Sequence, residues 1–277
     1  MFKDDGTLIR SVTIAGSSQA MLGLGFNPVT HQLLVIDFGA GKVLNVNPHN
    51  GNSSVFMTVT GSSGLNALTF DAAGNVYVSD SFQGIIWTTG PHGGAGTVWK
   101  QDPLLTTTGT PPFGANGIAF NRARSIMFVA NTGNDTLVQI AVSNVGGTLT
   151  AGAASVFTNG INGADGIVLD ANDNIWVAAN QADEIVVVDP TGQGDRQARR
   201  LQWRREWSDA GTAVSGKPRL QQGRRIAVGD QPGTGFALDR HHSVGRLAMG
   251  RPGDAPQHRA AARAHSADRA VRKPDIS

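Results

Sequence analysis

One short pattern occurs four times in the sequence, and it limits the fold more than any other feature. Each copy has an apolar stretch, a polar turn with Asn, Asp, Gly or Pro, and a second stretch in which apolar and polar residues alternate. A strand, a turn and a second strand in this order are typical of a β-hairpin. The four copies are LGLGFNPVTHQLLVID (22–37), LNALTFDAAGNVYVSD (65–80), NGIAFNRARSIMFVAN (116–131) and DGIVLDANDNIWVAAN (165–180).

The spacing of the copies indicates how many strands each repeat contains. The equivalent apolar residues Phe26, Phe70, Phe120 and Leu169 are 44, 50 and 49 positions apart. This leaves room for two further strands after each hairpin, and four strands in roughly 45 residues is the period of a β-propeller blade. We therefore predict an all-β fold, a β-propeller with about four intact blades. A β-sandwich or a β-solenoid is the alternative, because hairpins are common there too.

The composition agrees with many short strands and excludes several kinds of site. Glycine accounts for 36 of the 277 residues, which indicates many turns. The chain has no Cys, and therefore no disulfide, no thiolate zinc site and no Cys nucleophile. Because no run of about 18 apolar residues exists, we expect no membrane partner. The first residues do not read as a secretory signal. The compartment stays open, since an export signal could precede Met1.

The charge distribution changes abruptly near residue 193. Residues 1–193 hold 13 Asp and Glu against 6 Lys and Arg, a net charge of −7, whereas residues 194–277 hold 8 against 17, a net charge of +9. Fifteen of those 17 basic residues are Arg. A break of this kind is a boundary signal. We therefore expect the propeller blades in residues 1–193 and an irregular, poorly ordered Arg-rich tail in residues 194–277.

Three interpretations of this tail stay open. In the first, it is an out-of-frame translation of the last blade, because a shift of one base permits the string VIAKLGDFNG in place of residues 194–203. The second is a basic disordered tail. The third is an arm that binds nucleic acid, since Arg clusters bind phosphate. GC-rich DNA read in a wrong frame also yields many Arg residues, so we expect no nucleic-acid partner.

Polar residues recur at two positions of the hairpins. The start of the first strand lies beside the end of the second, so both positions are expected on one rim of the propeller. Carboxylate and amide oxygens that converge on a channel suit Ca²⁺, Mg²⁺ or Mn²⁺. The strand-start set, four residues before each apolar anchor, is Leu22, Asn66, Asn116 and Asp165. The strand-end set, a candidate rim of the site, is Asp37, Asp80, Asn131 and Asn180.

Both sets also have a purely structural interpretation. Asp and Asn at strand ends often bind nearby backbone groups and shape turns. For the strand-end set this structural role is the favoured interpretation. For the strand-start set both interpretations stay open. Asn116 and Asp165 each precede Gly-Ile and then an apolar strand, so they occupy equivalent positions in their blades.

These segments resemble a known family. NGIAF (116–120) and DGIVLD (165–170) look like strand starts of the senescence marker protein (regucalcin) and gluconolactonase family, and NIWVAANQADEIVVVDPTG (174–192) is similar to its bacterial members. The resemblance covers residues 22–193. It implies a six-bladed β-propeller as the parent fold. It also implies a small-molecule substrate and the metal-assisted hydrolysis of a lactone or related ester.

The resemblance further implies roles for three residues. Asn116 and Asp165 match positions that bind a divalent metal in the family, with Ca²⁺ as the first choice and Mg²⁺, Mn²⁺ or Zn²⁺ as others. Asn66 matches a substrate contact, and Asp165 is also a candidate general base. The family takes a Glu ligand from its first blade; that strand would precede Met1, and Leu22 is not a ligand. We therefore expect weak activity or none.

Two other functions stay open. One is a non-catalytic propeller that uses one face as a binding platform, because this fold serves many roles. The other is a propeller similar to the streptogramin lyases, which have metal and His at the channel. His31, His49 and His92 are not at strand starts, which weighs against the second alternative. In each case we expect a monomer.

Overall fold

The computed structural model describes residues 1–200, and within them almost every regular element is a strand. The predictions for the tail from residue 201 onward, including its reading frame and its order, lie outside the described residues. No helix among the described residues is long and apolar enough to cross a membrane. The two short 3-10 helices are η1 (Phe38–Ala40) and η2 (Pro103–Leu105).

The strands form four sheets, each of which contains one of the predicted hairpins at its inner end. The first sheet contains β1 (Met21–Phe26), β2 (Leu33–Asp37), β3 (Lys42–Val46), β4 (Ser53–Thr58) and the short β8 (Gly94–Ala95). The second contains β5 (Leu65–Phe70), β6 (Val76–Asp80), β7 (Ile85–Thr89) and β9 (Thr97–Gln101).

In the second sheet each strand pairs antiparallel with the next one in the order β5-β6-β7-β9, and the third and fourth sheets have the same arrangement. The third contains β10 (Ala115–Phe120), β11 (Ile126–Asn131), β12 (Thr136–Val145) and β13 (Thr148–Asn159). The fourth contains β14 (Ala164–Leu169), β15 (Ile175–Ala179), β16 (Glu184–Val188) and β17 (Gly194–Arg200).

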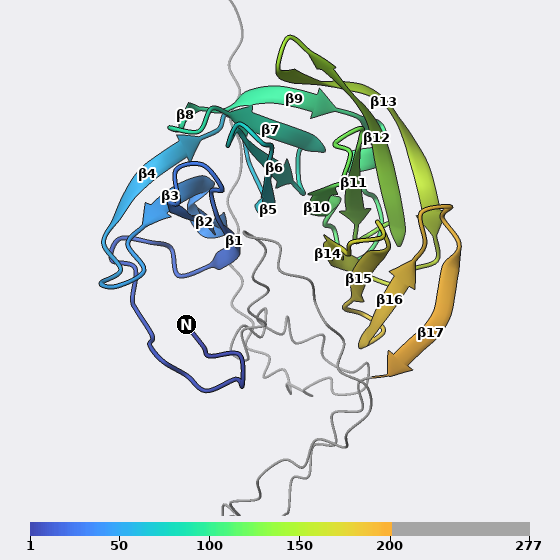
Figure 1. The fold of residues 1–277 in the computed structure, drawn as a ribbon, viewed down its shortest axis with the longest axis horizontal. Helices are drawn as coiled ribbons and strands as arrows, with labels where there is room; N and C mark the ends of the chain where they lie inside the picture. The colour runs from blue at the N-terminus through green and yellow to red at the C-terminus, as the bar shows by residue number, and fades with distance from the viewer. Residues whose placement is uncertain (201–277) are drawn as a thin grey trace, which may run out of the picture. The chain divides into compact units, whose positions relative to one another are not determined.

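The four sheets lie side by side around a common axis (Figure 1). The innermost strands of successive sheets are neighbours: β1 contacts β5, β5 contacts β10, and β10 contacts β14. The outer strands β4, β9, β13 and β17 lie at the periphery of the arc (Figure 1). This is the arrangement of propeller blades. The prediction of an all-β propeller with about four blades is therefore confirmed.

Three of the four clusters of the hydrophobic core lie between neighbouring blades, and the fourth packs Val35, Leu44 and Val46 of the first blade against Ile14. One of the three layers between blades joins Leu34 and Ile36 of the first sheet to Val76 of the second. The next two layers join the second sheet to the third and the third to the fourth. Both faces of a middle blade are thus covered, and all five residues of β6 are buried. Burial of each large aliphatic side chain contributes about 1.5–3 kcal/mol, so these layers hold the blades together.

The fourth sheet extends beyond the boundary expected from the sequence. We placed the end of the blades at residue 193, but β17 pairs antiparallel with β16 and completes the fourth sheet. Its seven residues belong to the segment that we assigned to the irregular Arg-rich tail. The backbone of β17 pairs with the free edge of β16, an interaction that does not require an alternating apolar pattern.

Candidate functional site

The strand-start residues all occupy the same irregularity of the sheet. In each blade the pairing of the two inner strands shifts near the start of the first strand, between Met21 and Leu24 in the first blade and between Ala115 and Ile118 in the third. The same shift occurs in the second and fourth blades. Two residues of the inner strand therefore lie opposite one residue of its partner, which is a β-bulge. The residues in the first bulge position are Leu22, Asn66, Asn116 and Asp165.

The second bulge position is small because the neighbouring blade approaches it closely. A Cβ atom on Gly117 would lie 2.7 Å from the backbone nitrogen of Ile167 in the next blade. A Cβ atom on Gly23 would lie 2.7 Å from the carbonyl oxygen of Asn66. Real Cβ atoms do not approach so closely, so Gly is required at these two positions, whereas the second blade has Ala67 at the equivalent position. The Asn-Gly and Asp-Gly pairs of the sequence thus mark the close contact between blades as well as a candidate site.

Asn66 and Asn116 each begin a relay of hydrogen bonds of the same kind. The Nδ2 atom of Asn116 donates to the Thr132 hydroxyl at 2.9 Å, and that hydroxyl donates to the carbonyl oxygen of Ala164 at 2.7 Å. In the preceding blade, the Nδ2 atom of Asn66 donates to the Ser81 hydroxyl at 3.1 Å, and that hydroxyl donates to the carbonyl oxygen of Ala115 at 2.6 Å.

The relay fixes the orientation of both amides. Each hydroxyl has one proton, which it gives to a carbonyl of the next blade, so it accepts from the Asn nitrogen. The oxygen of each amide then points away from the hydroxyl, and no described residue donates a hydrogen bond to the Oδ1 atom of Asn66 or Asn116. Asn116 is buried and Asn66 is partly buried. These two oxygens are therefore available to a ligand.

Asp165 lies in the fourth bulge, next to Asn116. It is half-buried, and the Nδ2 atom of Asn180 donates to its Oδ2 atom at 2.6 Å. Burial raises the pKa of the Asp165 carboxyl above its usual value, and hydrogen bonds from the side chains of Asn180 and Asn116 offset part of this rise. A desolvated carboxylate with two neutral partners is a stronger proton acceptor than a solvated one. The structure thus brings Asp165, Asn116 and Asn180 together.

Three residues of the strand-end set bind groups near them instead of facing the bulges. Asp80 is fully buried and accepts five hydrogen bonds, among them one from Gly64 at 2.9 Å and one from the Trp87 indole at 3.0 Å. Asn131 is also fully buried and donates to the carbonyl oxygens of Leu104 and Thr106. Such groups hold turns in place, which is the structural role that the sequence favoured for this set.

Asp37 is used in the same way in the first blade. It is fully buried and accepts from the backbone nitrogen and the hydroxyl of Ser18, and Lys42 lies 3.9 Å from its Oδ2 atom. Asn180 differs from the other three strand-end residues, since it is exposed and its amide donates to Asp165. Among the described residues, Asn180 is therefore the member of the set whose side chain forms a hydrogen bond with a strand-start side chain.

The donor atoms at the bulges fit a hard cation. Within residues 1–200, no group of three or more His, Cys, Asp or Glu side chains could hold a metal ion. The oxygen donors that the described residues offer there are the carboxylate of Asp165 and the amide oxygen of Asn116, whose nitrogen donates to that carboxylate. Oxygen donors of this kind suit Ca²⁺, Mg²⁺ or Mn²⁺. Leu22, at the equivalent position of the first blade, is 39% exposed and adds no donor.

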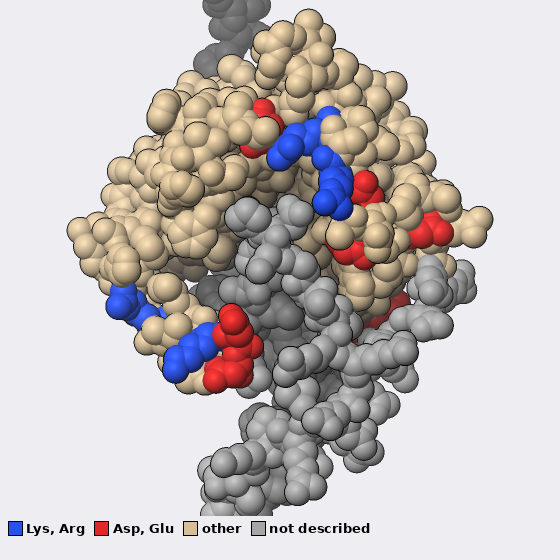
Figure 2. Space-filling model, in the orientation of Figure 1, with Lys and Arg blue, Asp and Glu red and all other residues tan. Residues whose placement is uncertain are grey.

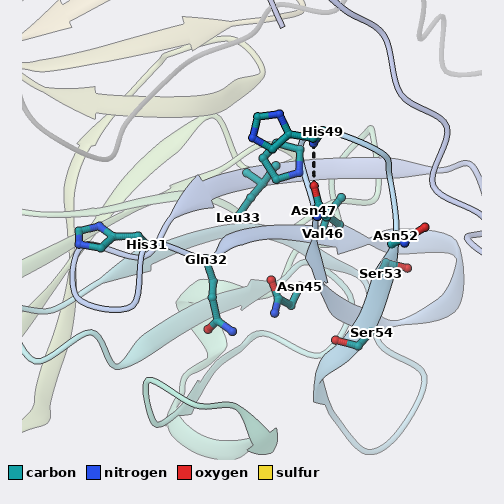
Figure 3. A pocket seen from close by; sticks show the side chains of 11 residues that line it. His31, Gln32, Leu33, Asn45, Val46, Asn47, His49, Asn52, Ser53 and Ser54 are labelled. Carbon is teal, nitrogen blue, oxygen red and sulfur yellow. Dashed lines mark hydrogen bonds between the residues drawn. The ribbon is translucent and has the colours of Figure 1, made fainter.

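An open hollow of about 550 Å³ lies at the end of the first sheet that is opposite to its bulge. Its lining includes His31, Asn45, His49 and Ser54, and the two imidazoles lie at different edges of the hollow (Figure 3). The Nδ1 atom of His49 is 2.9 Å from the Arg10 guanidinium.

Charged side chains are sparse on the face in Figure 2, where Lys and Arg gather near the middle of the arc and around the N-terminal segment. Neither the hollow nor these charged groups form a cluster suited to catalysis.

The sequence also matches a model built from known proteins. Residues 15–199 match the SMP-30/Gluconolactonase/LRE-like region. The chain belongs to this family. Individual lactonases are also similar to this chain. Lactonase drp35 of Staphylococcus epidermidis is 31% identical to it over 134 residues, and lactonase drp35 of Staphylococcus aureus strain MW2 is 28% identical over 130 residues. Each match covers 46% of this chain and 39% of the relative. The chain thus spans about two fifths of the length of these lactonases.

Solved structures with a similar fold include proteins that are named for different activities. Virginiamycin B lyase of Staphylococcus aureus is 13% identical with a TM-score of 0.51, over 70% of this chain and 60% of that protein. A putative 6-phosphogluconolactonase of Bacteroides fragilis is 17% identical with a TM-score of 0.51, over 71% of this chain and 62% of that protein. At these identities the likeness supports the propeller fold of this family member and nothing finer.

Several residues at the site were missed by sequence reasoning. Ser81 and Thr132 follow the strand ends directly, and their hydroxyls orient the two Asn amides. The contact of Asn180 with Asp165 was not foreseen either. The only signal in the sequence is a polar residue after each of two strand ends, and such residues are common in turns. The relay depends on carbonyl groups of the next blade, which a single repeat does not reveal.

Proposed function

We propose that this propeller hydrolyses a small lactone or related ester at the rim formed by its bulges. Membership of the lactonase-containing family supports a small ester as substrate. The observation that carries the proposal is the carboxyl group of Asp165, which is half-buried, has a raised pKa and has only amide partners. Groups whose pKa is raised by burial at a shared rim are typical of catalytic acids and bases.

In this proposal Asp165 accepts a proton from the attacking water. The raised pKa brings the carboxyl closer to the working pH, which is favourable for a general base. Asn180 donates to the Oδ2 atom and so holds the carboxylate in one orientation. Asn66 contacts the substrate through its Oδ1 atom, because the relay to Ser81 uses its nitrogen. The substrate is thus bound on the second blade and hydrolysed on the fourth.

We also propose that Asn116 and Asp165 hold a divalent cation, Ca²⁺ before Mg²⁺, Mn²⁺ or Zn²⁺. When bound, such a cation polarises an ester carbonyl and makes water more acidic. Asn116 contributes its amide oxygen, which Thr132 keeps free by accepting from the nitrogen. We expect the affinity to be low, because the bulges offer one carboxylate and Leu22 adds none. The activity of this chain is then impaired.

Hydrolysis of γ-butyrolactone by the full chain in the presence of Ca²⁺ tests the proposal. We expect Asp165→Asn to lower the rate by at least about 100-fold, the usual contribution of a positioned general base. Asp183→Asn is the matched control, because it makes the same change of charge on an exposed residue of the same blade. Equal rates for the wild type and Asp165→Asn would contradict the proposed role.

A non-catalytic binding platform is the other outcome of this experiment. It is supported if the wild-type chain hydrolyses no lactone with any of the four cations. A lyase-like function has less support, because His31, His49 and His92 follow strands or turns at the end of the sheets opposite the bulges. In either case we propose a monomer that acts on a small molecule and uses neither nucleic acid nor membrane as a partner.

A further inference from the structure

Three phenylalanine rings from three different blades meet at the rim that carries the bulges. Phe38 directly follows β2, Phe82 follows β6 with Ser81 in between, and Phe113 precedes β10 with Gly114 in between. The rings of Phe82 and Phe113 are stacked with centroids 5.7 Å apart, and Phe38 meets Phe82 edge-on, also at 5.7 Å. Phe38 and Phe113 are 6.4 Å apart. These distances are those of favourable aromatic pairs, so the rings form one contiguous surface, here called the aromatic platform.

The aromatic platform is continuous with the proposed substrate contact. The Phe82 ring lies against the backbone of Gly64, where an added Cβ atom would be 2.7 Å from the ring. Gly64 is two residues before Asn66, and the residue before Phe82 is Ser81, whose hydroxyl accepts from the Asn66 amide. Phe82 is therefore fixed beside Asn66 both through the chain and through packing.

Phe113 is tied to the same place. Its neighbour Gly114 donates to the carbonyl oxygen of Ser81 at 3.0 Å, so the segment before β10 is fastened to the end of β6. Three residues after Phe113 comes Asn116, the proposed cation ligand. The aromatic platform thus lies near two of the three proposed functional residues, Asn66 and Asn116.

The aromatic platform leaves ring surface that is accessible to a ligand. Phe82 is 49% exposed, whereas rings that only fill a core are buried. Contiguous exposed apolar surface on a soluble protein often marks a place where a ligand binds. Phe38 and Phe113 are half-buried and support the exposed ring from either side.

Apart from the amide oxygens of Asn66 and Asn116, the polar groups of Asp80, Asn131 and Gln83 near the aromatic platform take part in hydrogen bonds. Asp80 accepts five hydrogen bonds, and Asn131 donates to two backbone carbonyls. Gln83 donates to Asp80 and to the carbonyl oxygen of Thr60. A ligand with many hydroxyl groups would find few free partners there, whereas an apolar group would remove the exposed ring surface from water.

We propose that the aromatic platform binds the aromatic or other apolar substituent of the ester, while the ester group itself lies at the bulges. This inference rests on the proposed hydrolase function and narrows its substrate class to esters with an apolar substituent. Phe82 is then the main residue that determines specificity, because it has the most exposed ring and lies beside Asn66.

A matched pair of substrates tests this inference with the full chain. γ-Phenyl-γ-butyrolactone and γ-butyrolactone share the reacting ring and differ only in the phenyl group. We expect Phe82→Ser to lower the ratio of their kcat/KM values by about 3- to 10-fold, the size of one aromatic contact. Phe26→Ser is the control, because Phe26 is 46% exposed but lies at the other end of β1. An unchanged ratio in Phe82→Ser would overturn the inference.

A binding measurement separates this inference from the proposed hydrolase function. In the Asp165→Asn background, which we expect not to hydrolyse the lactone, saturation-transfer NMR reports contact between the protein and the phenyl protons. We expect the signal to disappear when Phe82→Ser is added and to persist when Phe26→Ser is added. Loss of the signal in the first double variant supports the aromatic platform even if the wild type proves inactive. A persistent signal there would overturn it.

Discussion

Asp80 in the second blade and Asp165 in the fourth lie at the same rim, but their surroundings are opposite. Asp80 is fully buried, and five donors from the backbone, Gln83 and Trp87 satisfy its carboxylate. Asp165 is half-buried and has two amide partners, Asn180 and Asn116. A carboxylate surrounded by donors holds the structure together, whereas one that is short of donors keeps lone pairs for a ligand.

The two aspartates differ in the donors that their surroundings supply, and this difference separates a structural carboxylate from one that is open to a ligand. Asp80 is at a strand end, where its own turn supplies donors from Phe82 and Gln83. Asp165 is at a bulge, and its described partners are the side chains of Asn180 and Asn116. The number of donors within reach therefore separates the two residues.

The largest effect is expected for the loss of the buried carboxylate. Asp80→Ala leaves five donors without an acceptor, among them the Trp87 indole in the core between the first two blades. We expect the free energy of unfolding to fall by about 3 kcal/mol or more. Chemical denaturation measures it, with Asp4→Ala as the exposed control. A change as small as that of the control would mean that Asp80 is not a structural group.

The opposite sign is expected for the stability of Asp165→Asn without metal. Burial raises the pKa of Asp165 in the folded state, so its contribution to stability is full at low pH and is lost as the pH rises through the folded pKa. The uncharged Asn avoids this loss. In the presence of a chelator we expect Asp165→Asn to melt at a higher temperature than the wild type at neutral pH. The difference should disappear below the usual pKa of Asp; a lower melting temperature at neutral pH would contradict this account.

A smaller effect is expected for the relay that orients Asn116. Thr132→Val removes the acceptor for the Asn116 amide and the donor to the carbonyl of Ala164. We expect a loss of about 1–3 kcal/mol in the free energy of unfolding and a weaker affinity for Ca²⁺. Thr132→Ser keeps the hydroxyl and should restore the affinity. If Thr132→Ser binds Ca²⁺ no better than Thr132→Val, the hydroxyl does not position Asn116.

Much of the fold could be predicted from the sequence because each blade begins with local information. The hairpin expected over residues 22–37 is observed as β1 and β2, and the alternation of apolar and polar residues with a polar turn was sufficient to find it. The strand β17 was missed, because an Arg-rich segment has no alternating pattern and its pairing is decided by the edge of β16.

The candidate site could be predicted only in part. Asn66, Asn116 and Asp165 were found from their equal distance to the apolar anchors, and they do occupy equivalent bulges. The bulge itself and the hydroxyl relay depend on the backbone of the next blade, which one repeat does not contain. For the same reason the sequence did not reveal the aromatic platform, whose three rings are 44 and 31 residues apart along the chain.

The most direct test of the difference between the two aspartates is a calorimetric titration of the full chain with Ca²⁺. It compares the wild type with Asp165→Asn and Asp80→Asn at a temperature where circular dichroism shows all three to be folded. We expect weak binding by the wild type, a similar affinity for Asp80→Asn and no binding by Asp165→Asn. Unchanged binding by Asp165→Asn, or loss of binding only in Asp80→Asn, would contradict the assignment of Asp165 to the ligand and Asp80 to the structure.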